Sequence, residues 1–304
     1  MRSRGRPTVA GVSISNPDRL LWPELGITKL EFVEFQESIA EWILPHLRDR
    51  PLTLVHCPKG LSGECTFMKH SKLWAPAQVR RVQIAEKTKV GDYLIVDDLP
   101  ALIGVAQMDV LELHTWNSKF ERVEEADRIV FDLDAGPKVK WTQVIEAAIQ
   151  IRRVLEALGL RSFVKNTGGS GLHVVVPLKP AVDWAECLRF SRLIAALFVR
   201  QDPKLYTTDY AKAGRKQKIL IDYLRNNRTN TSVCAYSTRA KPHAPVSVPL
   251  SWDELSEDVM ADHFTVRNVH KRLSRGRDPW REYSRTRQTL KPEMIAAVER
   301  TIAG

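Results

Sequence analysis

The chain has 304 residues, a formal net charge of +10 and 43% hydrophobic residues. This length suffices for one large domain or two lobes, and the composition is that of a soluble globular protein. No apolar run of transmembrane length and no secretory signal is present, so the sequence excludes a membrane-spanning class. The pI of about 9.5 favours an anionic partner such as nucleic acid, although a generally basic surface explains it equally well.

The four cysteines are scattered along the chain and form no CxxC pair. They are Cys57, Cys65, Cys187 and Cys234. Such spacing is typical of thiols in a reducing compartment, so we expect neither a zinc site nor a disulfide.

The N-terminal segment mixes helix and strand after a basic, flexible start. Thr28-Lys29-Leu30-Glu31 reads as a capping box that opens a helix running to about Ile43. Apolar runs predict strands near residues 52–57, 93–96 and 110–115.

The middle segment predicts alternating strands and helices. A helical stripe runs from Trp141 to Leu158 and is stopped by Gly159, and Asp183 caps a second helix that ends near Val199. The predicted strands are residues 127–134, 161–165, 172–178 and 217–224. The resulting βαββαβ order is the RRM-like unit of an α/β (α+β) fold, in which the first strand lies between the third and the fourth.

The C-terminal segment is less informative. We expect a strand at residues 246–249 and a short helix at residues 252–255. From Arg267 to Lys291 the chain is rich in arginine and lysine, which fits a solvated face, a nucleic-acid contact or a linker.

Asp132 and Asp134 lie in the apolar run Arg128-Ile129-Val130-Phe131-Asp132-Leu133-Asp134. Because side chains alternate along a strand, both carboxylates point to one face. Asp222 lies in a similar run, on the strand that the topology places next to them. Buried carboxylates need a compensating charge, and divalent ions held this way support phosphoryl or nucleotidyl transfer.

An Asp-x-Asp pair is a weak signal taken alone. Glycosyltransferases and haloacid-dehalogenase phosphatases also contain it, but the latter place Thr or Val two residues after the second aspartate, where this chain has Gly136. The placement of Asp222 on the neighbouring strand could also be accidental.

The turn Thr167-Gly168-Gly169-Ser170-Gly171 precedes His173 on the third core strand. Its N–H groups and hydroxyls could hold a phosphate, with His173 as a further donor, although glycine turns are also ordinary hairpin features. Arg225 and Arg239 follow the third aspartate and offer donors for a triphosphate, whereas Arg228 fits a surface position.

Two further residues have two interpretations each. Lys29 falls in the first turn of its helix, where it either completes an anion site with the helix N-terminus or extends into solvent. His114, on the predicted strand at residues 110–115, is either a functional residue or a hydrogen-bonded core residue, and the second is the commoner case for a lone histidine.

Taken together, these segments resemble the primase-like polymerase domain of bacterial ATP-dependent DNA ligase D, in the archaeo-eukaryotic primase superfamily. The resemblance covers residues 13–290. It rests on Phe131-Asp132-Leu133-Asp134-Ala135-Gly136-Pro137, Lys165-Asn166-Thr167-Gly168-Gly169-Ser170-Gly171-Leu172-His173, Ile221-Asp222-Tyr223-Leu224-Arg225-Asn226, His114-Thr115-Trp116-Asn117, Ala235-Tyr236-Ser237-Thr238-Arg239-Ala240 and Asp278-Pro279-Trp280.

The resemblance implies a primase-polymerase fold and a template-directed nucleotidyltransferase of non-homologous end joining. It implies gap filling and end extension with a preference for ribonucleotides, two Mn²⁺ or Mg²⁺ ions, and a cytoplasmic, nucleoid-associated setting. The implied partners are gapped or broken DNA with a 5′-phosphate, NTP or dNTP, Ku and a ligase domain, with no membrane. The metal ligands would be Asp132, Asp134 and Asp222.

The resemblance also assigns the residues around the substrates. The nucleotide would be bound by His114, Thr167, Ser170, His173, Arg225, Arg239 and Phe67, and the DNA 5′-phosphate by Arg19 and Lys29. Two positions depart from the family pattern: Thr66 replaces one of two adjacent aromatic residues, and Ser170 replaces a lysine, which removes one positive charge.

The implied domain spans residues 11–290, between a flexible N-terminus at 1–10 and a tail at 291–304. Its parts would be an N-terminal α/β lobe at about 11–123, an RRM-like catalytic core at about 124–231 and a C-terminal part at about 232–290. The alternatives are a stand-alone primase that starts strands de novo and a non-catalytic RRM-like binding module, which would place stacking aromatics where this sheet has aspartates.

Overall fold

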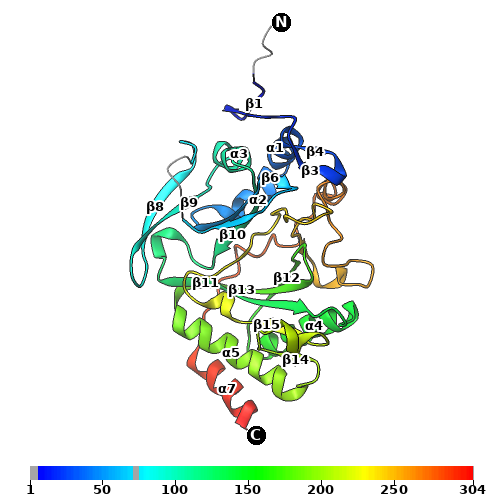
Figure 1. The fold of residues 1–304 in the computed structure, drawn as a ribbon. Coiled ribbons are helices and arrows are strands. Elements are labelled where there is room, and N and C mark those ends of the chain that lie inside the picture. The colour runs from blue at the N-terminus through cyan, green and yellow to red at the C-terminus, as the bar shows by residue number, and fades with distance from the viewer. Residues whose placement is uncertain (1–5, 71–74, 304) are drawn as a thin grey trace, which may run out of the picture. The chain divides into compact units, whose positions relative to one another are not determined.

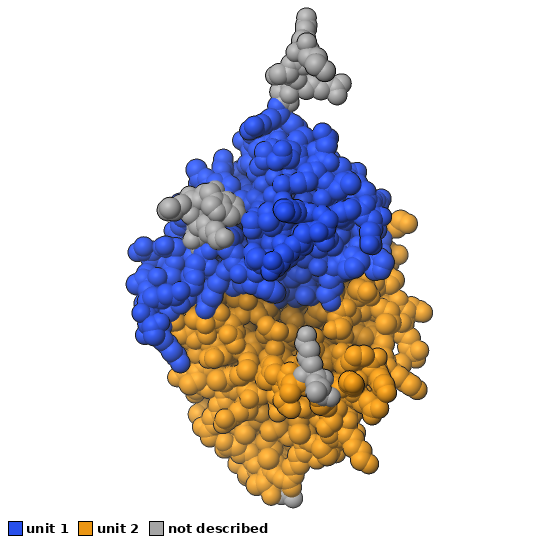
Figure 2. Space-filling view, viewed as in Figure 1, with its two compact units in different colours: residues 1–115, 233–246, 265–269 blue, residues 116–232, 247–264, 270–304 orange. Residues whose placement is uncertain are grey.

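The computed structural model describes residues 6–70 and 75–303, which divide into two compact units (Figure 2). Unit 1 contains the chain up to Thr115 together with residues 233–246 and 265–269. Unit 2 contains residues 116–232, 247–264 and the chain from His270. Each unit is therefore built from segments that are distant in sequence.

The described part of unit 1 combines helices with short antiparallel strands. Its elements are β1 (Thr8–Val9), β2 (Val12–Ser13), β3 (Leu20–Trp22), η1 (Pro23–Leu25), β4 (Ile27–Thr28), α1 (Lys29–Ser38), α2 (Ala40–Leu47), β5 (Leu52–His56), β6 (Pro58–Leu61), β7 (Thr66–Met68), β8 (Arg80–Ala85), β9 (Val90–Ile95), α3 (Leu99–Gln107) and β10 (Val110–Trp116), which ends at the unit boundary.

The predicted capping box of unit 1 is confirmed. The Thr28 hydroxyl accepts from the N–H of Glu31 at 3.2 Å, and the Glu31 carboxylate accepts from the N–H of Thr28 at 2.7 Å. The helix prediction to Ile43 is wrong in one respect, because α1 ends at Ser38 and α2 begins at Ala40. The Ser38 hydroxyl donates to the carbonyl of Phe35, the kind of side-chain bond that competes with helix continuation.

The cysteine prediction is wrong for one pair. Cys57 and Cys65 form a disulfide with their Cα atoms 4.3 Å apart, whereas Cys187 and Cys234 are buried free thiols. The intervening segment turns at Gly60, which has a φ of 61° and approaches the carbonyl of Leu20 too closely for any side chain. The tight turn brings the two thiols within reach.

Unit 2 is organised around one sheet and two long helices. Its elements are η2 (Phe120–Arg122), β11 (Glu125–Ala135), α4 (Trp141–Ala157), β12 (Phe163–Asn166), β13 (Gly171–Asp183), α5 (Trp184–Gln201), β14 (Tyr206–Thr207), η3 (Lys212–Arg215), β15 (Ile219–Asp222), η4 (Leu224–Asn226), β17 (Pro249–Leu250), η5 (Trp252–Glu254) and α7 (Pro292–Ala303); β16 (Thr231–Val233) and α6 (Val269–Leu273) cross the unit boundaries.

The predicted βαββαβ order is confirmed in unit 2. Its strands lie in the order β14-β15-β11-β13-β12-β17, so β11, the first core strand, lies between the third and the fourth. Helices α4 and α5 lie on the same side of this sheet (Figure 1). Ile129, Phe131 and Leu133 on β11 are fully buried, so the central strand anchors the core.

The two ends of the chain contain more regular structure than the sequence indicated. Of the expected flexible N-terminus, residues 1–5 lie outside the described part, and Thr8–Val9 form β1. The expected C-terminal tail instead forms α7, which packs against α5. The predicted short helix is confirmed as η5, and the predicted strand at 246–249 is reduced to β17.

No helix among residues 6–70 and 75–303 combines the length and apolar character needed to cross a bilayer.

Candidate functional site

Three aspartates meet on the sheet of unit 2. Asp132 pairs with Asp222 on β15 and with His173 on β13, so the central carboxylate has a polar neighbour on each side. Asp134 follows two residues later on β11, opposite Gly171, and points to the same face as Asp132. The convergence that the sequence predicted therefore exists in the fold.

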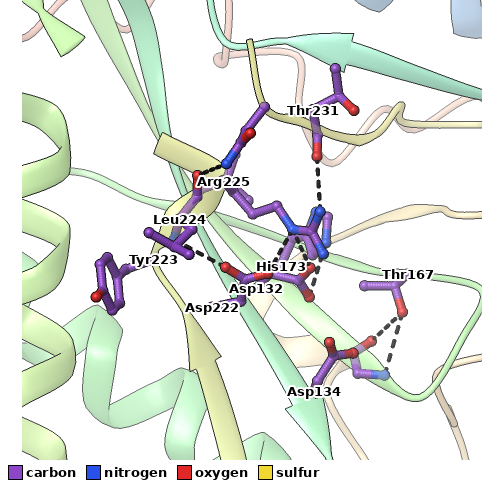
Figure 3. Close-up of polar contacts among 12 residues, drawn as sticks. Asp132, Asp134, Thr167, His173, Asp222, Tyr223, Leu224, Arg225 and Thr231 are labelled. Carbon is purple, nitrogen blue, oxygen red and sulfur yellow. Dashed lines mark hydrogen bonds and ion pairs between the residues drawn. The ribbon is translucent and has the colours of Figure 1, made fainter. Parts of the chain in front are cut away.

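Arg225 contacts two of these carboxylates. Its Nε lies 3.1 Å from Oδ2 of Asp132 and 3.0 Å from Oδ2 of Asp222. Its Nη1 donates to the carbonyl of Thr231 at 3.2 Å. Figure 3 shows the guanidinium group of Arg225 next to Asp132 and Asp222, the two carboxylates that it contacts.

A buried amide fixes the turn that carries Arg225. The side chain of Asn226 accepts from the N–H of Val130 at 2.7 Å and donates to its carbonyl at 2.8 Å, as a neighbouring strand would. The side chain of Asn117 donates to the carbonyl of Arg225 at 3.0 Å. Because Val130 lies two residues before Asp132, this clamp sets the position of Arg225 relative to the carboxylate.

The protonation of the central pair follows from burial and charge. Burial alone would raise the pKa of Asp132, but the hydrogen bond from His173 and the charge of Arg225 outweigh it and hold this pKa well below its usual range. Burial, together with the charge of Lys165, lowers the pKa of His173 to about 4, so the ring is neutral at pH 7. A neutral ring still donates from Nε2 to Oδ1 of Asp132, 3.2 Å away.

Asp134 has the opposite shift. The negative charge of Asp132, followed by burial, raises the pKa of Asp134 to about 6. The Ser170 hydroxyl donates to Oδ1 of Asp134 at 3.5 Å. The face thus carries more negative charge than its own side chains offset.

This donor set fits a hard divalent cation. Carboxylate oxygens are the ligands that Mg²⁺ and Mn²⁺ prefer, and a raised carboxyl pKa marks a place where added positive charge is favourable. Among the described residues no three Asp, Glu, His or Cys side chains are already arranged as a cation cage. Arg225 contacts both Asp132 and Asp222 in this arrangement.

The glycine-rich turn is organised by Thr167. Its hydroxyl accepts from the N–H of Gly169 at 3.2 Å and donates to the carbonyl of Gly171 at 3.1 Å, and the N–H of Gly168 donates to the carbonyl of Ala261. The expectation that the backbone of this turn holds phosphate is therefore wrong for these N–H groups, which already have acceptors. Gly171 is required sterically, since a Cβ there would lie 1.7 Å from the Leu133 carbonyl oxygen.

In unit 1, His114 and Arg239 share one carboxylate. Glu112, two residues before His114 on β10, accepts from its Nε2 at 2.8 Å and lies 3.0 Å from Nε of Arg239. Phe67 on β7 is 73% exposed, and its ring lies edge-on to the His114 ring at 6.0 Å. His114 therefore belongs to a cluster of charged and aromatic side chains that includes Glu112 and Phe67.

Arg19 and Lys29 also share one carboxylate in unit 1. Asp109 contacts Arg19 and lies 3.1 Å from Nζ of Lys29. Lys29 is 1% exposed, so its interpretation as a solvated lysine is wrong. Burial lowers the pKa of Lys29, and the charge of Asp109 opposes this shift.

The helix N-terminus beside Lys29 is not an open anion site. The N–H groups of Lys29 and Leu30 donate to the carbonyls of Arg19 and Pro17, and that of Glu31 donates to Thr28. An anion would therefore have to be bound by the side chains of Arg19 and Lys29 rather than by the backbone of α1.

Comparison with known proteins decides the family. The model of the family "LigD, primase-polymerase domain" matches residues 28–280. The chain belongs to the LigD primase-polymerase family.

Relatives and a solved structure agree with this assignment. The chain is 37% identical to the multifunctional non-homologous end joining protein LigD of Pseudomonas aeruginosa, over 95% of this chain and 35% of that protein. It is 34% identical to the protein of the same name from Mycolicibacterium smegmatis, over 81% of this chain and 32% of that protein.

The polymerase domain of Mycobacterium tuberculosis ligase D, solved in complex with DNA, superposes with a TM-score of 0.83 at 28% identity. The superposition spans 90% of this chain and 97% of the chain of that structure. The mixed α/β fold is thus the fold of a LigD polymerase domain. The chain spans about a third of the length of the two curated relatives.

Sequence reasoning missed several polar residues of this LigD domain. Glu112 was signalled by its spacing of two from His114 on a strand, but it was not selected. Asp109 and Asn226 had no such signal, because their partners lie far away in the sequence. Tyr210 was also missed, and its hydroxyl donates to Oδ1 of Asp222 at 2.7 Å.

The raised pKa of Asp134 makes a prediction about stability. In the native state this carboxyl binds its proton more tightly than in the unfolded chain, so its ionisation lowers stability as pH rises from 3.8 to about 6. We expect Asp134→Asn to be more stable than wild type by roughly 1–3 kcal/mol at pH 7 in chelator, and equally stable at pH 3.5.

Thermal melting at both pH values measures this difference. Added Mn²⁺ should raise the melting temperature of wild type more than that of Asp134→Asn, since the variant lacks the charge that attracts the ion. Equal melting of the two proteins at pH 7 in chelator would contradict the repulsion between Asp132 and Asp134.

Proposed function

We propose that this chain is a template-directed polymerase that fills gaps and extends ends in bacterial non-homologous end joining. The observation that carries the proposal is the meeting of Asp132, Asp134 and Asp222 on one sheet face within a LigD primase-polymerase domain. The proposed reaction is attack of a primer 3′-hydroxyl on the α-phosphate of a nucleotide, with loss of pyrophosphate.

Two divalent ions, Mn²⁺ or Mg²⁺, complete the proposed site. Asp132 and Asp134 would hold both ions, and Asp222 mainly the one beside the primer. When bound, such ions activate the attacking hydroxyl and neutralise the leaving pyrophosphate. The residues of the chain then supply orientation: His173 holds the carboxylate of Asp132, and Asn226 fixes the turn that carries Arg225.

We propose nucleotide-binding residues in each unit, described here unit by unit. In unit 2 we propose Thr167, Ser170, His173 and Arg225. In unit 1 we propose His114 and Arg239 for the phosphates and Phe67 for a base, because an exposed aromatic ring offers a stacking surface. With Thr66 in place of a second aromatic residue, base contact on β7 rests on Phe67.

The proposed DNA contact beyond the primer is a downstream 5′-phosphate bound by Arg19 and Lys29. Their two positive charges exceed the single charge of Asp109 by one. Arg19 is 30% exposed in its side chain, and its Nε has no acceptor among the described residues. A phosphate would supply one.

The repair role is proposed from the relatives, which are named as multifunctional end-joining proteins. We propose that this domain works with a ligase domain and Ku at broken or gapped DNA, in the cytoplasm with the nucleoid. Synthesis on a single-stranded template without primer would instead favour a primase, and DNA binding without metal-dependent turnover would favour a binding module.

Primer extension tests the catalytic assignment. We expect Asp132→Ala, Asp134→Ala and Asp222→Ala each to lower extension at least about 10³-fold, because each removes a ligand that stabilises transition-state charge. Asp253→Ala, which removes an exposed carboxylate on η5, is the matched control and should extend normally. Near-normal extension by a site variant would remove that residue from the site.

Sugar preference is a second test. We expect a higher kcat/KM for ribonucleotides than for deoxyribonucleotides, with Thr167 as a partner of the 2′-hydroxyl. Thr167→Val should move the ratio of the two values toward one. Thr167→Ser keeps the hydroxyl that organises the turn and should keep the ratio. An unchanged ratio in Thr167→Val would exclude Thr167 from sugar recognition.

A downstream 5′-phosphate should tighten binding to gapped DNA about ten- to a hundred-fold at low salt, and less at high salt. Arg19→Gln should reduce this preference while the buried Lys29–Asp109 pair remains, and Lys29→Met should remove it further. Extension on a simple primer–template should stay nearly intact in both.

The measurement is a binding titration with matched 5′-phosphate and 5′-hydroxyl gaps at two salt concentrations. If wild type binds both gaps equally at low salt, Arg19 and Lys29 are a structural ion cluster only.

A further inference from the structure

Glu112 is the buried carboxylate on which two of the proposed nucleotide-binding side chains converge. One oxygen, Oε2, accepts from Nε2 of His114 at 2.8 Å and lies 3.0 Å from Nε of Arg239. The other, Oε1, accepts from the N–H of Ala240 at 2.7 Å. Its side chain is 7% exposed, so solvent contributes little to holding this arrangement.

The backbone around this cluster is fixed by further hydrogen bonds within unit 1. The N–H of Cys234 donates to the carbonyl of Leu113 at 2.9 Å, and the N–H of Leu113 donates to the hydroxyl of Ser237 at 2.9 Å. The Thr238 hydroxyl also donates to the carbonyl of Leu111. The segment that carries Arg239 is thus tied to β10 on both sides of Glu112.

A buried carboxylate such as Glu112 is costly unless other groups compensate its charge. Burial alone would raise the pKa of Glu112, but the hydrogen bond from His114 and the charge of Arg239 outweigh it and lower the pKa to about 2. The carboxylate therefore stays ionised throughout the working pH range. It acts as a permanent counter-charge and not as a proton carrier.

Resting on the function proposed above, we propose that Glu112 is a positioning residue of the nucleotide site. Its carboxylate holds the imidazole of His114 and the guanidinium of Arg239 in one arrangement that receives the polyphosphate of a nucleoside triphosphate. The exposed ring of Phe67 beside His114 places a base-stacking surface next to the same pair. Glu112 itself does not touch the nucleotide.

A fixed pair of donors explains why one carboxylate serves two side chains. A shared carboxylate accepts from both donor side chains and so holds them side by side before the substrate arrives. Pre-arranged donors also lose less entropy when the triphosphate binds. A purely structural ion pair such as Glu254 with Arg272 needs only one cation.

The test compares Glu112→Gln with wild type in nucleotide KM, kcat and direct nucleotide binding. Gln keeps the shape and an acceptor for Ala240 but removes the charge. We expect KM for the nucleotide to rise about ten-fold or more, and kcat to change less than about three-fold. Affinity for DNA and the overall fold by circular dichroism should remain as in wild type.

Two variants serve as comparisons. Glu112→Asp keeps the charge on a shorter side chain and should recover part of the nucleotide affinity. Glu254→Gln removes a different arginine-paired carboxylate, whose pKa is also lowered to about 2, and should lower thermal stability without changing nucleotide KM. If Glu112→Gln behaves like Glu254→Gln, Glu112 is structural and the inference is wrong.

A double-mutant cycle with Arg239→Gln isolates the coupling. If Glu112 acts through Arg239, adding Glu112→Gln to Arg239→Gln should raise KM by less than it does in wild type. Full additivity would overturn the inference. Calorimetric titration with ATP keeps the test independent of turnover, so inactive wild type would count against the proposed polymerase and not against Glu112.

Discussion

Charge compensation inside an apolar sheet is the constraint on which unit 2 depends. β11 buries Ile129, Phe131 and Leu133 on one face and presents Asp132 on the other. An isolated carboxylate in such a place would cost several kcal/mol. Arg225 and His173 offset this cost for Asp132, and the Asn226 clamp holds the turn from which Arg225 reaches back. Asp134 remains without comparable compensation, which is why its pKa rises while that of Asp132 falls.

The two clusters of unit 1 repeat the principle in another form. Glu112 joins His114 to Arg239, and Asp109 joins Arg19 to Lys29. In each cluster one acidic side chain arranges two basic ones. An anionic substrate must then share these donors with a resident carboxylate, which limits affinity but leaves the donors in place before binding. In the proposed reaction, limited affinity would favour release of pyrophosphate.

The strand order and the meeting of three aspartates could be predicted, because period-two alternation and the βαββαβ order are local patterns with one common solution. The partners that arrange the basic side chains of unit 1 could not all be predicted. Arg19 and Asp109 lie 90 residues apart, and Glu112 and the N–H of Ala240 lie 128 residues apart, so no local pattern links the members of either pair.

Two local features of unit 1 were also missed. The Cys57–Cys65 disulfide was not predicted because cysteine spacing does not reveal how tightly Gly60 turns the chain. The helix break after Ser38 was not predicted because the sequence has a good helical pattern there, and the competing bond from the Ser38 hydroxyl to the Phe35 carbonyl is visible only in the structure.

Arg225 links the metal ligands to the nucleotide in the proposed mechanism. Its Nε contacts the same two carboxylates, Asp132 and Asp222, that are proposed to hold divalent ions. One carboxylate oxygen cannot serve a guanidinium and an ion equally well, since like charges would then lie within a few ångströms. In the proposed mechanism Arg225 would therefore loosen one of these contacts when cations bind, and a triphosphate would offer the guanidinium another anion. The arginine that stabilises the buried carboxylates without metal would in this way become a ligand of the substrate when metal and nucleotide bind together.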